Sequence, residues 1–88
     1  MLSDLSVEFS ELALSGLARV TDDESRRESL KAALKYYLRR DAQYEGRPCP
    51  AFDDRELYLY NFWRCRVLYE VLSTYVWIWS VTLRDEQV

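Results

Sequence analysis

Alternating apolar and polar residues over Arg64–Arg84 predict two β-strands joined by a short turn. In the first strand, one set of alternate residues is Cys65, Val67, Tyr69 and Val71. The residues between them are Arg66, Leu68, Glu70 and Leu72. The run Tyr75–Val81 after the turn is rich in β-branched and aromatic residues, which suit a well-covered pleated surface. Ser73-Thr74 is a weak turn signal because it lacks the glycine or asparagine of a favoured two-residue turn, so the prediction depends on the flanking runs. We expect this hairpin to form the middle of the sheet and to carry the functional chemistry.

The N-terminal part of the chain predicts a short strand followed by a helix. Leu5–Phe9 alternates apolar and polar residues, and Ser10 is a suitable N-cap for a helix that ends near Val20. Gly16 inside this helix costs about 1 kcal/mol relative to alanine. A close approach of the helix to the sheet is one compensation that such a glycine allows.

A second helix is expected to begin in the segment Thr21–Ser25 and to end near Arg40 or Asp41. Its start fits a capping box, either Thr21 with Glu24 or Ser25 with Glu28. An apolar stripe follows helical spacing: Leu30, Ala33, Leu34, Tyr37 and Leu38. A basic ridge lies beside this stripe at intervals of four residues: Arg27, Lys31, Lys35 and Arg39. The ridge is either a solvated helix face or a surface that binds along phosphates.

The remaining elements complete an α+β pattern. Both prolines and the second glycine mark Tyr44–Asp54 as a loop, and Arg55–Asn61 alternates as a further strand. The element order is therefore β-α-α-β-β-β, which predicts a single α+β domain over residues 1–88. We expect both helices to pack on one face of a small, mainly antiparallel four-stranded sheet, and the other face to be open.

The last predicted strand is apolar on both faces. Its two sets are Val76 with Ile78, and Trp77 with Trp79 and Val81. A strand that is apolar on both sides is normally covered on both sides. We therefore predict that a partner chain or a second copy covers the open face. The alternative is that long side chains such as Arg66 lie over the tryptophans.

The composition narrows the chemistry that the chain can perform. The chain has no histidine, which removes the usual general base, zinc ligand and catalytic triad. Its net charge of −3 argues against an indiscriminate nucleic-acid binder, although basic residues outnumber acids over 26–40 and 61–84. The two cysteines, Cys49 and Cys65, predict free thiols. Since no apolar run is long enough to cross a membrane and no signal-peptide pattern is present, we expect a cytoplasmic location.

Three segments resemble the RelE/ParE superfamily of bacterial toxins. They are Val7–Ser10 before the helix pair, the strand Arg66–Val71 and the closing segment Trp77–Glu86. With the element order, the resemblance covers essentially the whole chain. It implies a RelE-like fold, the toxin of a type II toxin–antitoxin pair, and a proteic antitoxin as partner. It leaves open whether the toxin forms a homodimer or a heterotetramer with the antitoxin.

The resemblance also implies roles for particular residues. In the ribosome-dependent mRNA endonucleases of this superfamily, an arginine on the third strand and another at the end of the fourth contact the scissile phosphate. Here these are Arg66 and Arg84, whose charge would stabilise the negative charge that builds up on phosphorus. Glu70 and Tyr60 are the candidate proton acceptors, although neither is a strong candidate. No cofactor and no metal ion are expected. The residues expected to bind RNA are Arg27, Lys31, Lys35, Arg39 and Arg64.

Two departures from the endonuclease pattern keep other functions open. The second strand carries Leu57–Tyr60 where the endonucleases usually have lysines, and no tyrosine or histidine follows Arg84. ParE-like members inhibit DNA gyrase without hydrolysis, so a gyrase inhibitor is one alternative. A degenerate member that only binds its antitoxin is another. Because both arginine positions are filled, we predict an mRNA interferase that acts on the ribosome.

Overall fold

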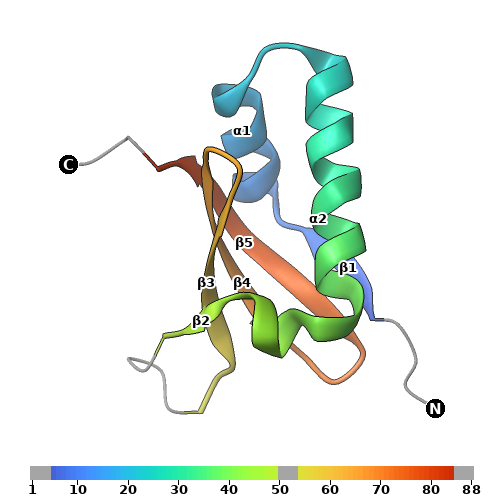
Figure 1. Cartoon of the computed structure of the whole chain (residues 1–88), viewed down its shortest axis with the longest axis vertical. Coiled ribbons are helices and arrows are strands. Elements are labelled where there is room, and N and C mark those ends of the chain that lie inside the picture. Colours follow the sequence, from blue (N-terminus) through green and yellow to red (C-terminus); the bar gives the residue numbers. More distant parts are fainter. Residues whose placement is uncertain (1–4, 50–53, 85–88) are drawn as a thin grey trace.

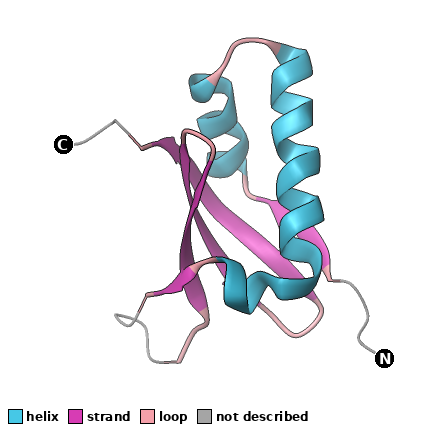
Figure 2. Cartoon of the chain, viewed as in Figure 1, coloured by secondary structure: helices cyan, strands magenta, loops and turns pink. Residues whose placement is uncertain are grey.

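The computed structural model describes residues 5–49 and 54–84 and shows two helices on one face of a five-stranded sheet (Figures 1 and 2). The elements are β1 (Ser6–Phe9), α1 (Glu11–Val20), α2 (Glu24–Glu45), β2 (Arg47–Pro48), β3 (Leu57–Phe62), β4 (Cys65–Val71) and β5 (Tyr75–Leu83). The strand order across the sheet is β1-β5-β4-β3-β2, with β1 parallel to β5 and the other neighbouring pairs antiparallel. The predicted α+β class, the mainly antiparallel sheet and the central β4–β5 hairpin are confirmed.

The sheet has five strands and not the predicted four, because the segment after α2 forms an additional edge strand, β2. Arg47–Pro48 pairs with β3, and the Cys49 N–H donates to the Leu57 carbonyl at 2.8 Å. Proline is acceptable here because an edge strand has one side without a hydrogen-bonding neighbour. The loop predicted over Tyr44–Asp54 is therefore wrong in its first part, and its residues 50–53 lie outside the described part of the chain.

Helix α2 continues past Asp41, one of its two predicted ends. Asp41 has non-helical backbone angles (φ −115°, ψ 35°), so the helix bends there and then makes one more turn. The sheet holds this last turn in place. The buried Tyr69 hydroxyl donates to the Ala42 carbonyl and accepts from the Gly46 N–H at 2.9 Å. The end of α2 is therefore set by tertiary hydrogen bonds, which the helical spacing of apolar residues does not reveal.

The start of α2 also differs from the prediction. Asp23 is the N-cap, and its carboxylate accepts from the N–H groups of Ser25 and Arg26 at 3.0 and 3.3 Å. The expected capping boxes beginning at Thr21 or Ser25 are wrong, because Asp23 directly precedes the first helical residue. The Thr21 hydroxyl instead accepts from the Asp23 N–H at 3.2 Å. Asp23 caps the helix as the predicted Thr21 or Ser25 would have done, since its carboxylate satisfies N–H groups that have no partner within the helix.

Helix α1 is fixed to β5 at two points. Ser10 is its N-cap, as predicted: the hydroxyl accepts from the Ala13 N–H at 3.0 Å and donates to the Trp79 carbonyl at 2.7 Å. Gly16 lies directly against β5, where an added β-carbon would be 1.9 Å from the Val81 carbonyl oxygen. The glycine therefore permits the close helix–sheet contact that its position inside a helix suggested.

A bulge in β5 changes which of its apolar residues face the helices. The β4–β5 pairing shifts between Leu68 and Tyr69, which leaves Trp79 as an extra residue on β5. Beyond the bulge Val81 turns toward the helices, so the expectation that it shares a face with Trp77 and Trp79 is wrong. The buried residues between the helices and the sheet include Val7, Ala13, Leu17, Leu34, Leu38, Val67, Tyr69, Val76, Ile78 and Val81.

Candidate functional site

Arg66 lies on the face of the sheet that is turned away from the helices, and Arg84 directly follows the end of β5 beside it. Arg66 of β4 pairs with Thr82 of β5, and the Arg84 N–H donates to the Arg64 carbonyl at 2.9 Å. The residues on either side of Arg66 are buried against the helices, so alternation along the strand directs Arg66 outward. Arg84 follows Thr82 by two residues and is the diagonal neighbour of Arg66, a position typically roughly 7–8 Å away. Two guanidinium side chains at this spacing can contact the same phosphate.

The Arg66 side chain is exposed and unneutralised. Among residues 5–49 and 54–84, its guanidinium has no ion-pair or hydrogen-bond partner. Its cross-strand neighbours Asn61 and Thr82 are polar but carry no charge. A guanidinium in such surroundings can form charge-assisted hydrogen bonds to an anionic ligand without first breaking an internal ion pair.

An ion pair occupies the opposite end of the same face. Glu70, which is only 8% exposed, accepts from the Arg55 guanidinium at 2.7 and 3.1 Å and from the Trp79 indole N–H at 3.1 Å. The Arg55 guanidinium also lies 5.5 Å from the centroid of the Trp79 ring. Arg55, and not Arg66 as the sequence suggested, is therefore the long side chain that covers a tryptophan. The alternation of polar and apolar residues gave no signal for this role of Arg55.

Neither candidate proton acceptor is suited to act as a base. The hydrogen bonds from Arg55 hold the pKa of Glu70 below its usual value, so its carboxylate binds a proton weakly. Burial raises the pKa of the Tyr60 hydroxyl, which therefore stays protonated at neutral pH. Burial likewise raises the pKa of the Cys65 thiol, although the charges of Arg64 and Arg84 act in the opposite direction. What this face offers a ligand is fixed positive charge.

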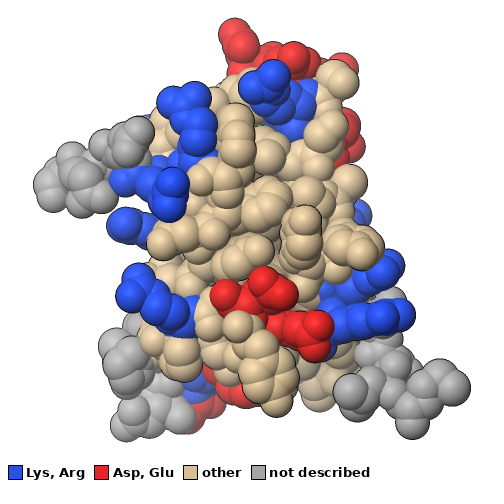
Figure 3. Space-filling view, in the orientation of Figure 1, with Lys and Arg blue, Asp and Glu red and all other residues tan. Residues whose placement is uncertain are grey.

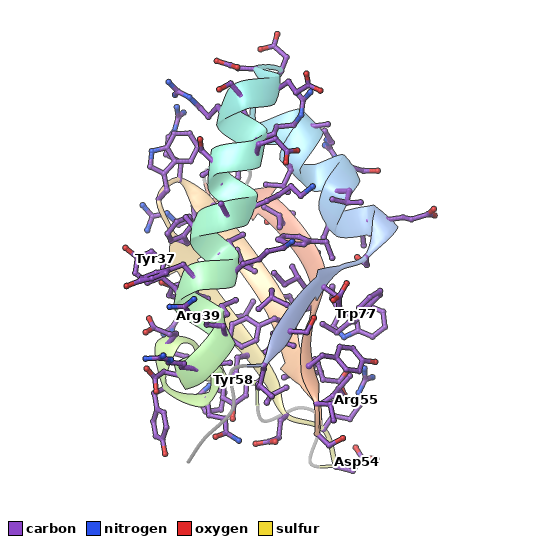
Figure 4. All side chains as sticks on the ribbon, turned by 90° about the vertical axis from the view of Figure 1, so that its right-hand side faces the viewer. Tyr37, Arg39, Asp54, Arg55, Tyr58 and Trp77 are labelled. Atoms are coloured by element: carbon purple, nitrogen blue, oxygen red, sulfur yellow. The ribbon has the colours of Figure 1, made fainter. Side chains whose placement is uncertain are left out.

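The basic ridge of α2 belongs to the helix layer, on the other side of the sheet from Arg66. The Lys31 ammonium lies 6.0 Å from the ring centroid of Phe9, so the ridge follows the edge of the molecule formed by β1. In Figure 4, Arg39 lies on α2 while Trp77 lies across the molecule from it. The structure therefore does not bring the ridge and the open-face arginines into one site.

The other residues expected to bind RNA have separate surroundings. Arg27 donates to the Thr21 carbonyl at 3.0 Å, which ties it to the α1–α2 connection. Lys35 is exposed on α2. Arg64 occupies the two-residue turn between β3 and β4, with its backbone bonded to Arg84. Of the five residues, only Arg64 adjoins the predicted catalytic pair.

The elements and their order describe an α+β fold with a helix pair on one face of a mainly antiparallel sheet. A chain in the crystal structure of the toxin–antitoxin complex RelBE2 from Mycobacterium tuberculosis is similar to this chain with a TM-score of 0.77, 18% sequence identity and 98% of each chain covered. No family model matches the sequence, and the search of curated proteins finds no significant match. The structural similarity confirms the RelE-like fold that the sequence resemblance implied.

The described residues hold neither a metal-binding cluster nor a membrane-spanning helix. No group of three histidine, cysteine or carboxylate side chains in this part of the chain is placed to hold a metal ion. No helix there is both long enough and apolar enough to cross a membrane. Both cysteines, Cys49 and Cys65, are free thiols, as predicted.

Proposed function

We propose that this chain is the toxin of a type II toxin–antitoxin pair and that it cleaves mRNA on the ribosome. The observation that carries this proposal is the placement of Arg66 and Arg84 at diagonal positions on one exposed face. The similar chain comes from a structure of a toxin–antitoxin complex, which supports an antitoxin as partner. The reaction needs no cofactor, because RNA carries its own nucleophile in the 2′-hydroxyl group.

The proposed chemistry assigns the two arginines to charge stabilisation. As the 2′-oxygen attacks the adjacent phosphorus, a new oxygen–phosphorus bond forms and the bond to the 5′-oxygen breaks. Negative charge builds up on the non-bridging oxygens, to which Arg66 and Arg84 donate hydrogen bonds. Donors that are aimed at such charge are each worth roughly 10²–10³ in rate. Removal of the proton from the 2′-hydroxyl is assigned to a group of the ribosome-bound complex, because Glu70 and Tyr60 are unsuited to it, and the leaving 5′-oxygen takes a proton from solvent water.

Cleavage of ribosome-bound mRNA, mapped by sequencing RNA ends, tests this function. We expect Arg66→Ala to lower the cleavage rate about 100-fold or more. Arg66→Lys is expected to recover part of the rate, because an ammonium retains the charge but not the bidentate geometry. Arg47→Ala is the matched control, since Arg47 is exposed on β2 at the edge of the sheet. Growth arrest with intact mRNA would remove the ribonuclease function.

The open face also suits coverage by the antitoxin. Tyr75, Trp77 and Trp79 form an aromatic row along β5, with ring centroids 6.5 and 5.9 Å apart. An antitoxin segment lying along this row would bury apolar surface and at the same time shield Arg66 from RNA. Co-expression with the product of a neighbouring reading frame is expected to restore growth, and Trp77→Ala is expected to weaken that rescue.

Inhibition of DNA gyrase without hydrolysis is the second candidate function. The β3–β4 register places Leu59 opposite Leu68 on the open face, where both are half-buried, whereas Leu57 opposite Glu70 is buried. Apolar residues at these positions favour a protein target over a phosphate backbone. A supercoiling assay with purified gyrase separates the two functions, because the ribonuclease leaves gyrase unaffected. A chain that affects neither ribosomes nor gyrase but binds the antitoxin is the degenerate member.

A further inference from the structure

The tip of the β3–β4 hairpin carries a tryptophan beside a cleft. Trp63 is 42% exposed and has a φ of 57°, in the left-handed region that bulky side chains rarely adopt. Backbone strain of this kind persists only where the surroundings fix it, and it is concentrated at binding sites. The cleft has a volume of about 520 Å³ and is lined by Arg26, Ser29, Leu30, Phe62 and Trp63.

Two guanidinium groups flank the exposed indole. The Arg26 and Arg64 side chains lie 5.9 and 5.7 Å from its ring centroid. Both distances are close to the limit of about 6 Å for a cation–π contact, so the ring is only loosely covered. Within the described ranges 5–49 and 54–84, neither guanidinium is paired with a carboxylate. The hairpin tip therefore combines an accessible aromatic ring with two positive charges.

The cleft opens on the helix side of the sheet, since Arg26, Ser29 and Leu30 belong to α2, but the hairpin tip that borders it adjoins the end of β5 next to Arg84. The Arg64 carbonyl accepts the hydrogen bond from the Arg84 N–H, and the side chain of Arg64 contacts Trp63. In Figure 3, blue Lys and Arg atoms gather at the left of the molecule, over the β3–β4 turn and the end of β5. A nucleic-acid strand held at Arg66 and Arg84 would reach the hairpin tip within a few nucleotides.

We infer that the cleft beside Trp63 binds one nucleotide of single-stranded RNA. The base stacks on the indole ring, and the adjoining phosphates bind Arg26 and Arg64. Unpaired bases commonly stack on aromatic side chains while guanidinium groups hold the backbone. The inference rests on the proposed function, which it deepens by naming a substrate subsite. An apolar peptide fits less well, because it would leave both guanidinium groups without an anionic partner.

Titration of the full chain with a short fluorescein-labelled single-stranded RNA tests the subsite. Trp63→Gly removes the ring and suits the positive φ, so this variant is expected to fold. We expect it to bind RNA about tenfold more weakly, the effect of losing one stacked base. Trp63→Phe keeps a stacking ring and is expected to bind nearly as tightly as the wild type. Unchanged RNA affinity in a folded Trp63→Gly chain would overturn the inference.

The salt dependence of the same titration tests the phosphate contacts. Arg26→Gln and Arg64→Gln are each expected to reduce the slope of log affinity against log salt by about 0.7, the value for one single-strand phosphate. Arg47→Gln, on the edge strand β2 and outside the cleft lining, is the matched control and is expected to leave the slope unchanged. Equal slopes in the wild type and in both cleft variants would contradict these contacts.

A cleavage assay in parallel separates the failure of this subsite from failure of the proposed function. If Arg66→Ala abolishes mRNA cleavage and Trp63→Gly changes neither cleavage nor affinity, the ribonuclease stands and the subsite is wrong. If the wild type cleaves no RNA but Trp63→Gly lowers its RNA affinity, the subsite stands and the ribonuclease function is wrong. Inorganic polyphosphate is added as a competitor in the same titration. If the wild type and Trp63→Gly then bind RNA equally tightly, the cleft binds phosphate and not a base, and the stacking inference is overturned.

Discussion

Gly16 of α1 lies so close to Val81 of β5 that a β-carbon on the glycine would be 1.9 Å from the valine carbonyl oxygen. That oxygen belongs to a central part of the sheet and cannot rotate away as the end of a side chain could. The contact draws α1 onto the sheet, where Ala13 and Leu17 become fully buried. A glycine that weakens the isolated helix therefore strengthens its packing.

Replacing Gly16 with alanine is expected to lower the free energy of unfolding by about 3 kcal/mol, the upper end of the range for overpacking. Helix propensity alone predicts the opposite sign, a gain of about 1 kcal/mol. Urea denaturation measures the difference. Ser15→Ala, at an exposed position of the same helix, is the control and is expected to stay within about 0.5 kcal/mol of the wild type. A stabilised Gly16→Ala chain would show that the close contact does not exist.

Replacing Tyr69 with phenylalanine is expected to lower the free energy of unfolding by about 2–3 kcal/mol. The buried hydroxyl bonds both the Ala42 carbonyl and the Gly46 N–H, and its removal leaves these two groups without that partner. Thermal and urea unfolding measure the loss. Tyr44→Phe provides the control because the Tyr44 side chain is 83% exposed. Equal stability of the two variants would mean that the last turn of α2 does not depend on Tyr69.

The sequence predicted those parts of the fold that local pattern determines. Alternation identified the β4–β5 hairpin, and Ser10 marked the start of α1. The features that it missed depend on contacts between distant segments. Tyr69 extends α2 beyond Asp41. Strand β2 exists because the chain that leaves α2 runs beside β3. Neither interaction leaves a trace in the spacing of residues along the helix or the loop.

In the candidate site, too, the sequence indicated which residues matter, whereas their arrangement depends on contacts between distant segments. Family resemblance selected Arg66 and Arg84, but their shared face depends on strand register, which a single bulged residue such as Trp79 can shift. The ion pair joins Arg55, which precedes β3, to Glu70 of β4, and the alternation of residues along the chain does not reveal it. The basic ridge was evident as a pattern, yet only the fold shows that it lies on the other side of the sheet from Arg66.

Replacing Glu70 with glutamine is expected to destabilise the fold in a manner that depends on pH. Hydrogen bonds from Arg55 lower the pKa of Glu70 in the folded chain, so the folded state binds this proton more weakly than the unfolded state does. Stabilisation by Glu70 is therefore complete above the unfolded pKa of about 4.3, and it is lost as the pH falls through the folded pKa. Urea denaturation at a series of falling pH values is expected to show the difference in stability between the variant and the wild type shrinking as the pH decreases.

Glu28→Gln serves as the control for this experiment, because Glu28 is exposed and pairs with Lys31 at 3.5 Å. An exposed pair of this kind contributes little to stability. Its replacement is expected to shift the unfolding midpoint only slightly at any pH. A difference between Glu70→Gln and the wild type that stays constant down to about pH 3 would show that the carboxylate charge is not the stabilising feature.

The ridge and the open-face arginines are expected to affect different kinetic constants. Under the proposed ribonuclease function, Lys31 and Lys35 would hold ribosomal RNA without touching the scissile phosphate, because they lie on the helix layer, away from Arg66. The double variant Lys31→Ala/Lys35→Ala is therefore expected to raise KM several-fold and leave kcat nearly unchanged, whereas Arg66→Ala lowers kcat. Steady-state cleavage of mRNA on purified ribosomes measures both constants. Equal losses of kcat in the two variants would mean that the ridge takes part in the chemical step, and unchanged KM in the double variant would identify the ridge as a solvated helix face.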